Sequence, residues 1–315
     1  MADYVLINMK RKIRILSYIL ISAILSTSCD GYEGDQTVPS YLKIDAIDLV
    51  DDPEDSWSQE SGFFSSNIDA VNIVFYCDGD TAETVLGTFQ LPCKVPMLRE
   101  GNISYMRIQP VVKQNGIAST RIFYSFYQPI RLENIHMTAD SVTDLGTLQT
   151  MFISKNNMRV LWQEFFEPGP SEVSLDTVVQ RLVYQSDTVC NGYGCGVVRV
   201  TPETKSLDFW SDTLYYVGDA STVLYLEIDY WSDFDFRIGL KNPAYSEGPD
   251  VTYYAETIYA TKPNRKWNKI YVNLGKLWSS RYYNHYPYIR LYFTILNSDK
   301  KSGNLFIDNI KLLAQ

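Results

Sequence analysis

The chain is poor in histidine, and no common catalytic motif uses the two it has. Only His136 and His285 occur among the 315 residues. The sequence contains no His-x-His, no His-Glu-x-x-His and no Gly-x-Ser-x-Gly, so the patterns of hydrolytic metal sites and serine esterases are missing. A Ser-His-Asp triad would have to use one of these two side chains. We expect His136 at the surface or at a strand edge, and His285 in a packing role.

Positive charge is also scarce. The 28 Lys and Arg residues face 37 Asp and Glu residues, which gives a net charge of −9. A nucleic-acid binder should show a basic face, and a binder of anionic polysaccharide a basic cleft. Neither is evident as a run of residues, so we expect no nucleic-acid partner. Aromatic residues are abundant at 14%, with 24 Tyr and 6 Trp, as suits half-buried strands or binding surfaces.

Helical periodicity is missing from the body of the chain, whereas short strand-like stretches are frequent. Residues 41–50, YLKIDAIDLV, alternate apolar and polar side chains with a period of two. A strand within 68–76 ends in a predicted Asp78-Gly79 turn, and a second turn is predicted at Gly101-Asn102. The sequence therefore predicts an all-β protein. Further strands are predicted within 84–98, 103–112, 160–166, 222–231, 234–241, 266–275, 288–296 and 303–313.

Turn clusters group these strands into two β-sandwiches. The rhythm of strand, Asp-Gly, strand, Leu-Gly and Pro in residues 41–152 resembles small extracellular sandwiches of the Ig-like or PEGA-like kind. Residues 153–160, ISKNNMRV, are predicted to be a hinge. Residues 161–315 are predicted to form the second sandwich.

One short apolar run occurs near the N-terminus. Basic residues at 10–14 precede the apolar residues 15–25, and small residues then lead to Cys29. The run is shorter than the roughly 20 residues of a membrane span, and its flanks are those of a secretory signal. We therefore expect residues 1–28 to be a signal peptide. Met9 is the expected start, because Asp3 is acidic where such a signal should be basic.

Cys29 after these small residues resembles the lipobox of bacterial lipoproteins. Ser26 stands where the usual pattern has Leu, and Leu25 lies one position further out. The resemblance implies a mature chain that begins at Cys29 and is held by lipid in an outer membrane. Residues 29–40 form an acidic, Gly-bearing tether, similar to the start of surface-exported Bacteroidota lipoproteins. The alternative is an ordinary signal peptide that happens to end in cysteine.

Five cysteines are present, and lipidation of Cys29 would leave four. An oxidising compartment permits disulfides, and sequence-local partners close small loops. We therefore predict the pairs Cys77–Cys93 and Cys190–Cys195. Metal ligation is less favoured, because neither pair has the short Cys-x-x-Cys form and no histidine lies nearby.

The strands that open and close the second half resemble the jelly-roll of galactose-binding-like domains and carbohydrate-binding modules. The resembling stretches are the opening Phe-Glu strand, YLEIDYW, WNKIYVNLG and IDNIKL. Such modules hold a structural Ca²⁺ where the first and last strands meet. The resemblance implies Glu164 or Glu167 together with Asp308 as oxygen ligands here. Alternatively, Asp308 only begins a turn. No other cofactor is implied.

An aromatic stretch between predicted strands is the candidate binding site. Pro287 cannot donate to a sheet ladder, so the residues before it are predicted to be a partly exposed loop. Sugar faces stack on flat rings, and sugar hydroxyls bond to Asn or Arg side chains. A packing role is the alternative. The candidate residues are Trp278, Arg281, Tyr282, Tyr283, Asn284, His285, Tyr286 and Tyr288.

These features favour a non-enzymatic envelope lipoprotein whose jelly-roll binds a glycan or a partner protein. The first rival is a structural component of a surface assembly, in which the aromatic loop forms a protein interface. The second is a glycan-active hydrolase, which needs two carboxylates at a defined separation. Glu227 and Asp229 share one face of a strand, where we expect a solvated surface. The other carboxylate candidates are Asp233, Asp235 and Glu256.

Overall fold

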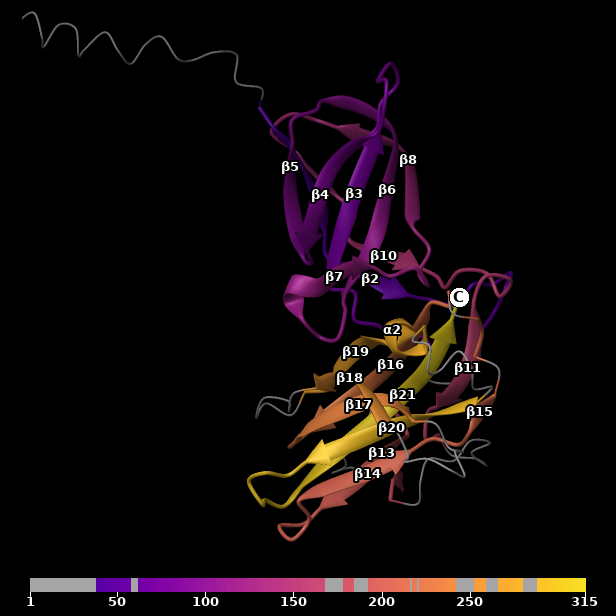
Figure 1. Cartoon of the computed structure of the whole chain (residues 1–315). Helices are drawn as coiled ribbons and strands as arrows, with labels where there is room; N and C mark the ends of the chain where they lie inside the picture. The colour runs from indigo at the N-terminus through magenta and orange to yellow at the C-terminus, as the bar shows by residue number, and fades with distance from the viewer. Residues whose placement is uncertain are drawn as a thin grey trace, which may run out of the picture.

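The computed structural model describes residues 38–57, 62–167, 178–183, 192–215, 217–219, 221–241, 252–258, 266–279 and 288–315. The described residues form an all-β protein, as predicted, with two bodies of strands stacked end to end (Figure 1). The strands of the first body are β1 (Ser40–Ile44), β2 (Ala46–Leu49), β3 (Ala70–Tyr76), β4 (Thr84–Gln90), β5 (Cys93–Met97), β6 (Gly101–Lys113), β7 (Arg121–Phe123), β8 (Ile130–Met137), β9 (Val142–Asp144) and β10 (Thr147–Thr150), with a short 3-10 helix at Ala118–Thr120.

The second body contains the remaining strands and one short helix. They are β11 (Arg159–Glu164), β12 (Gln180–Val183), β13 (Gly194–Val200), β14 (Ser206–Trp210), β15 (Leu214–Tyr215), β16 (Leu224–Ser232), β17 (Asp235–Lys241), β18 (Thr252–Ile258), β19 (Asn268–Asn273), α2 (Gly275–Trp278), β20 (Tyr288–Leu296) and β21 (Gly303–Ala314). No helix among these residues is long and apolar enough to cross a bilayer.

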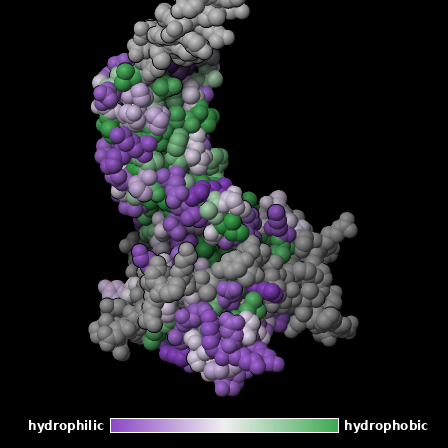
Figure 2. Space-filling view, turned by 90° about the vertical axis from the view of Figure 1, so that its left-hand side faces the viewer, coloured by the Kyte–Doolittle hydropathy of each residue, from purple (hydrophilic) through white to green (hydrophobic). Residues whose placement is uncertain are grey.

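The N-terminal sandwich packs two main sheets together. One has the order β5-β1-β9, and the other has the order β4-β3-β6-β7 with β8 paired to β6. Leu42 and Val95 from the first sheet meet Ile73 and Ile108 from the second in a closed core. On the face seen in Figure 2, hydrophilic and hydrophobic residues are interspersed over this sandwich. The predicted turn at Gly101-Asn102 is wrong, because both residues begin β6.

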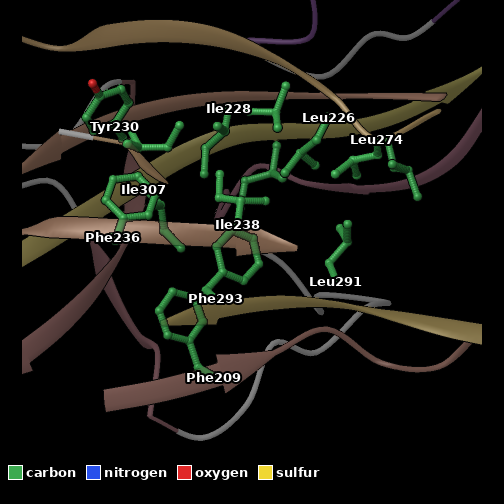
Figure 3. Close-up of a cluster of buried hydrophobic side chains, with 14 of the residues drawn as sticks. Phe209, Leu226, Ile228, Tyr230, Phe236, Ile238, Leu274, Leu291, Phe293 and Ile307 are labelled. Atoms are coloured by element: carbon green, nitrogen blue, oxygen red, sulfur yellow. The ribbon is translucent and has the colours of Figure 1, made fainter. Parts of the chain in front are cut away.

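The C-terminal sandwich also has two layers. The first sheet has the order β12-β13-β21-β16-β19 with β11 paired to β21, and the second has the order β14-β20-β17-β18 with β15 paired to β20. Alternate residues of both sheets fill the core between them, where Leu226, Ile238 and Phe293 are fully buried (Figure 3). The other residues of each strand point away from this core, so each sheet also has an outer face.

The two bodies meet in a second apolar cluster. Phe63, Tyr124 and Phe152 of the first body pack there with Tyr225 and Tyr271 from β16 and β19 of the second. The N-terminal sandwich therefore covers part of the outer face of the first C-terminal sheet. The C-terminus of β21 also ends close to this junction (Figure 1).

The segment 153–160, which we predicted as a hinge, takes part in the junction. Met158 is buried in the same apolar cluster, and Phe152 just before the segment is also buried there. The backbone N–H of Lys155 donates to Asp55 Oδ2 at 3.0 Å. The link between the bodies is thus tied to both of them by contacts as well as by the chain.

The predicted Cys77–Cys93 disulfide is wrong in this fold, because both residues are separate thiols. Cys77 follows the last residue of β3, whereas the β3–β4 register places Gln90, and so Cys93, beside the first residue of β3. A seven-residue strand keeps the two ends about 20 Å apart, and a disulfide needs Cα atoms within about 7 Å. For the other predicted pair, Cys195 is buried in β13 and Cys190 lies outside the described residues.

Candidate functional site

An aromatic and charged surface lies on the outer face of the sheet β14-β20-β17-β18. Trp210 in β14 is the register partner of Tyr292 in β20, and their rings are parallel with centroids 6.0 Å apart. Gly239 in β17 is the next partner of Tyr292 and adds no side chain beyond the tyrosine ring. We call this outer face, with Trp210, Tyr292, Arg237 and Lys241, the platform face.

Charged groups frame the stacked rings of the platform face. The ammonium of Lys241 lies 5.5 Å from the Trp210 ring centroid and 5.0 Å from that of Tyr292, so it can hold both rings by cation–π attraction. Arg237 is exposed one row further along. On the other side Arg290 Nε donates to Thr213 Oγ1 at 3.1 Å, which fixes the guanidinium beside the rings.

This arrangement suits a ligand with one apolar face and a polar rim. The parallel pair is aligned along a row of the sheet, and Tyr292, which is only 6% exposed, backs the tryptophan ring. Trp210 is half-buried, which leaves part of the indole open to solvent. Sugars have this amphipathic character, since their C–H faces stack on rings and their hydroxyls bond to charged side chains.

The carboxylates predicted as Ca²⁺ ligands lie near the edge where β11 pairs with β21. Asp308 is fully buried, and its Oδ2 has no hydrogen-bond partner within the described chain. Burial raises the pKa of Asp308 to about 9, and the negative charges of Asp229 and Glu167 add to that rise. Glu164 Oε1 instead accepts from the backbone N–H of Phe166 at 2.7 Å.

The oxygens of Asp308 and Glu167 supply some of the ligands that a Ca²⁺ site needs. A buried carboxylate oxygen without a donor, close to a second carboxylate, is the environment in which Ca²⁺ would replace a proton. Across the described ranges, however, no group of three or more His, Cys, Asp or Glu side chains is arranged to hold a metal. Further ligands would have to be backbone or amide oxygens.

Of the comparisons with known proteins, the one with solved structures found matches. No family model matches the chain, and no curated protein matches it. The chain is similar to a family 61 carbohydrate-binding module in complex with β-1,4-galactotriose, at 14% identity over 49% of this chain and 97% of that one, with a TM-score of 0.32. It is also similar to a family 11 module from Clostridium thermocellum in complex with a mixed-linked tetrasaccharide, at 15% identity over 48% and 93%, with the same score of 0.32.

The predicted exposure of the aromatic loop is wrong for Trp278, the candidate whose side chain the structure describes. Trp278 is only 3% exposed and lies in the sandwich core. It ends the short helix α2, and its Nε1 donates to the carbonyl of Asp219 at 2.6 Å. Trp278 is therefore a packing residue, because the chain turns inward after β19. The other candidates, Arg281, Tyr282, Tyr283, Asn284, His285 and Tyr286, lie outside the described residues.

The predicted solvated face of β16 is also wrong. Glu227 and Asp229 are 0% and 3% exposed, because the N-terminal sandwich covers them. Lys311 Nζ lies 2.9 Å from Glu227 Oε2, and Lys269 Nζ lies 3.5 Å from the same oxygen and 3.4 Å from Asp229 Oδ1. We call these four side chains the junction network. The two lysines face the two carboxylates, so the four side chains form a buried network of ion pairs.

Side chains from the N-terminal sandwich complete the junction network. The hydroxyl of Tyr124 donates to Glu227 Oε1 at 2.9 Å, and that of Ser65 donates to Asp229 Oδ2 at 2.6 Å. Lys311 donates to the carbonyl oxygen of Phe63. Gly62 packs directly against the side chain of Asn309, so a Cβ at this position would displace that side chain.

Neither the platform face nor the junction network was predicted from the sequence. The signal for the first was present, because Trp210 and Tyr292 occupy outward positions of strands whose alternate residues are apolar. The signal for the second was a lysine within the otherwise apolar last strand. His136, by contrast, is exposed as predicted, with Nδ1 2.8 Å from Asn102 Oδ1.

Proposed function

We propose that this protein is a non-enzymatic glycan-binding protein of the cell envelope and that the platform face binds the glycan. The observation that carries the proposal is the stacked pair of Trp210 and Tyr292 under Lys241. Tyr292 is buried and holds the half-buried indole of Trp210 in place, so a sugar that stacks on the open part of Trp210 costs little side-chain entropy.

The position of the N-terminal sandwich supports the choice of this face. It occupies part of the outer face of the opposite sheet through Tyr225, Tyr271 and Leu313. The platform face belongs to the other layer of the sandwich. A module that presents one sheet and docks through the other can bind a long, chain-like ligand while its partner sandwich acts as a spacer.

A binding role is favoured over a hydrolytic one by the state of the acidic residues. A glycosidase needs one carboxylic acid and one carboxylate on either side of the bond to be cleaved. Glu227 and Asp229 are buried and neutralised by Lys311 and Lys269, so they are not available for that role.

Anchoring by lipid on Cys29 belongs to the same proposal. The apolar run before Cys29 would direct export, and lipid on Cys29, followed by the acidic residues after it, would then hold the sandwiches at the surface of an outer membrane. A Ca²⁺ ion held by Asp308 with Glu167 would fix β21 close to the opening strand and would have a structural role.

The proposal is tested by screening the mature chain on a glycan array and measuring each positive oligosaccharide by calorimetry. We expect Trp210→Ala to weaken binding roughly tenfold or more, about 1.4 kcal/mol, in a variant that is still folded at the assay temperature. Tyr193→Ala is the matched control, because Tyr193 is an exposed aromatic residue outside the platform face, with 65% of its surface exposed. No binding to any glycan, or equal weakening by both variants, would overturn the proposal.

A further inference from the structure

A pocket of about 430 Å³ lies at the junction of the two sandwiches. It is lined by residues 65–67 of the N-terminal body and by Asp229 and residues 267–269 of the C-terminal body. We call it the junction pocket. Its volume lies within the range of small-molecule sites, about 300–1,000 Å³. Because both bodies supply its wall, the pocket exists only while they are docked.

Two buried charged side chains face this pocket. The side chain of Lys269 is 3% exposed and that of Asp229 is 4% exposed. The nearest carboxylate oxygens lie 3.4 Å and 3.5 Å from Lys269 Nζ, whereas a charge-assisted hydrogen bond is shortest near 2.7–2.9 Å. An ammonium has three donors, so Lys269 keeps the capacity to donate to an acceptor in the pocket.

The charges around the junction pocket cancel. Glu227 and Asp229 carry two negative charges, and Lys269 and Lys311 carry two positive ones. A net-neutral wall with paired charges favours an uncharged ligand over an anion or a cation, since either ion would leave an unpaired charge in a partly buried site.

The remaining lining combines one aromatic ring with amides and hydroxyls. Trp267 is half-buried, packs against the apolar cluster that contains Trp231 and Phe306, and lines the pocket. Asn67 and Asn268 are exposed on opposite sides of it, and each amide offers both donors and an acceptor. The ring can stack on the C–H face of a ligand, and the polar groups can form hydrogen bonds with its hydroxyls.

We infer that the junction pocket is a second binding site, for a single uncharged sugar residue that stacks on Trp267 and accepts a hydrogen bond from Lys269. It shares only its class of ligand with the proposed function, because the platform face lies on the other sheet. The sugar is a free monosaccharide or the end of a glycan chain.

Fluorine NMR of the full mature chain labelled with 5-fluorotryptophan tests this inference without altering the fold. The chain has six tryptophans, and Trp267→Phe and Trp210→Phe assign the two resonances of interest. The probes are D-glucose, D-galactose, cellotetraose and β-1,4-galactotriose. D-glucuronic acid and D-glucosamine are the charged controls.

We expect at least one neutral sugar to shift the Trp267 resonance, with an affinity at least tenfold higher than that of its charged control. Ser66→Tyr and Asn268→Tyr fill the pocket from opposite bodies and should abolish the shift. A monosaccharide that acts alone identifies a free sugar, and a response only to the oligosaccharides identifies a chain end.

The inference is overturned if no neutral sugar shifts Trp267, if charged and neutral probes act equally, or if folded filling variants respond as the wild type does. Failure of the proposed function gives a different result. Oligosaccharides would then leave the Trp210 resonance unshifted, whether or not the Trp267 resonance shifts.

Discussion

Lys311→Met is the sharpest test of the junction network. Lys311 Nζ lies 2.9 Å from Glu227 Oε2, and both side chains are 0% exposed. With an effective dielectric constant near 20, the attraction at this distance is about 6 kcal/mol. Removing each ion from water costs several kcal/mol, so the two effects nearly cancel. The net value of the intact pair is therefore small.

The single variant measures something different, because it leaves Glu227 buried without its closest cation. Breaking a buried pair from one side costs about 3–5 kcal/mol, and we expect that loss for Lys311→Met in urea unfolding at pH 7. The double variant Lys311→Met/Glu227→Gln removes both charges and should return to within about 1 kcal/mol of the wild type. Lys43→Met removes the exposed Lys43–Asp144 contact and should have no measurable effect.

Two results would refute this reasoning. A single-variant loss below about 1 kcal/mol would mean that water reaches Glu227, and the pair would then behave as an exposed one. A double variant as unstable as the two single variants combined would mean that packing of the lysine stem, and not the charge, stabilises the junction. The ammonium group itself faces two aromatic rings, since Lys311 Nζ lies 5.0 Å from the Phe63 centroid and 5.1 Å from that of Phe152.

Three further predictions follow from the proposed anchoring, metal and charge states. Cys29→Ala should leave the protein soluble or uncleaved, and normal processing with unchanged membrane association would exclude lipidation. Ca²⁺ at a hundredfold its Kd should raise the unfolding free energy by about 2.7 kcal/mol in the wild type but not in Asp308→Asn; a wild type that ignores Ca²⁺ contradicts the site. Burial lowers the pKa of Lys311 from 10.5 to about 8. Between pH 8 and pH 10.5, Lys311 therefore keeps its proton in the unfolded chain and loses it in the folded chain. Its contribution to the free energy of unfolding rises with pH over this interval. Urea unfolding at pH 8 and 10.5 should show a smaller rise in Lys311→Met/Glu227→Gln, and equal rises would contradict the lowered pKa.

The strands of the C-terminal sandwich could be predicted from the sequence because their pattern is locally determined. Residues 224–231 alternate between the core and the outer face, and so do residues 289–295. Period-two alternation reports which side chains share a face, and this is sufficient to identify a sandwich strand. Pairing order and register depend on distant segments, which is why Cys77 and Cys93, which lie near opposite ends of β3, were mistaken for disulfide partners.

The candidate sites were harder to predict because burial by a second domain leaves no local pattern. Glu227 and Asp229 look like residues of a solvated face, and only the N-terminal sandwich makes them buried. Trp278 follows a strand and precedes a proline-containing stretch, which is typical of a loop, yet a single helical turn directs its ring into the core. Trp210 and Tyr292 are far apart in sequence and become neighbours only through the β14–β20 register.

Hydrogen–deuterium exchange with a bound oligosaccharide is the most direct test of the central claim. With the best glycan from the array at saturation, we expect slower exchange in peptides that cover β14 and β20, the strands of Trp210 and Tyr292. Peptides of β3 and β6, in the N-terminal sandwich, should exchange at their original rates. Protection confined to the N-terminal sandwich or to β16 and β21, with β14 and β20 unchanged, would contradict the assignment of the platform face as the glycan site.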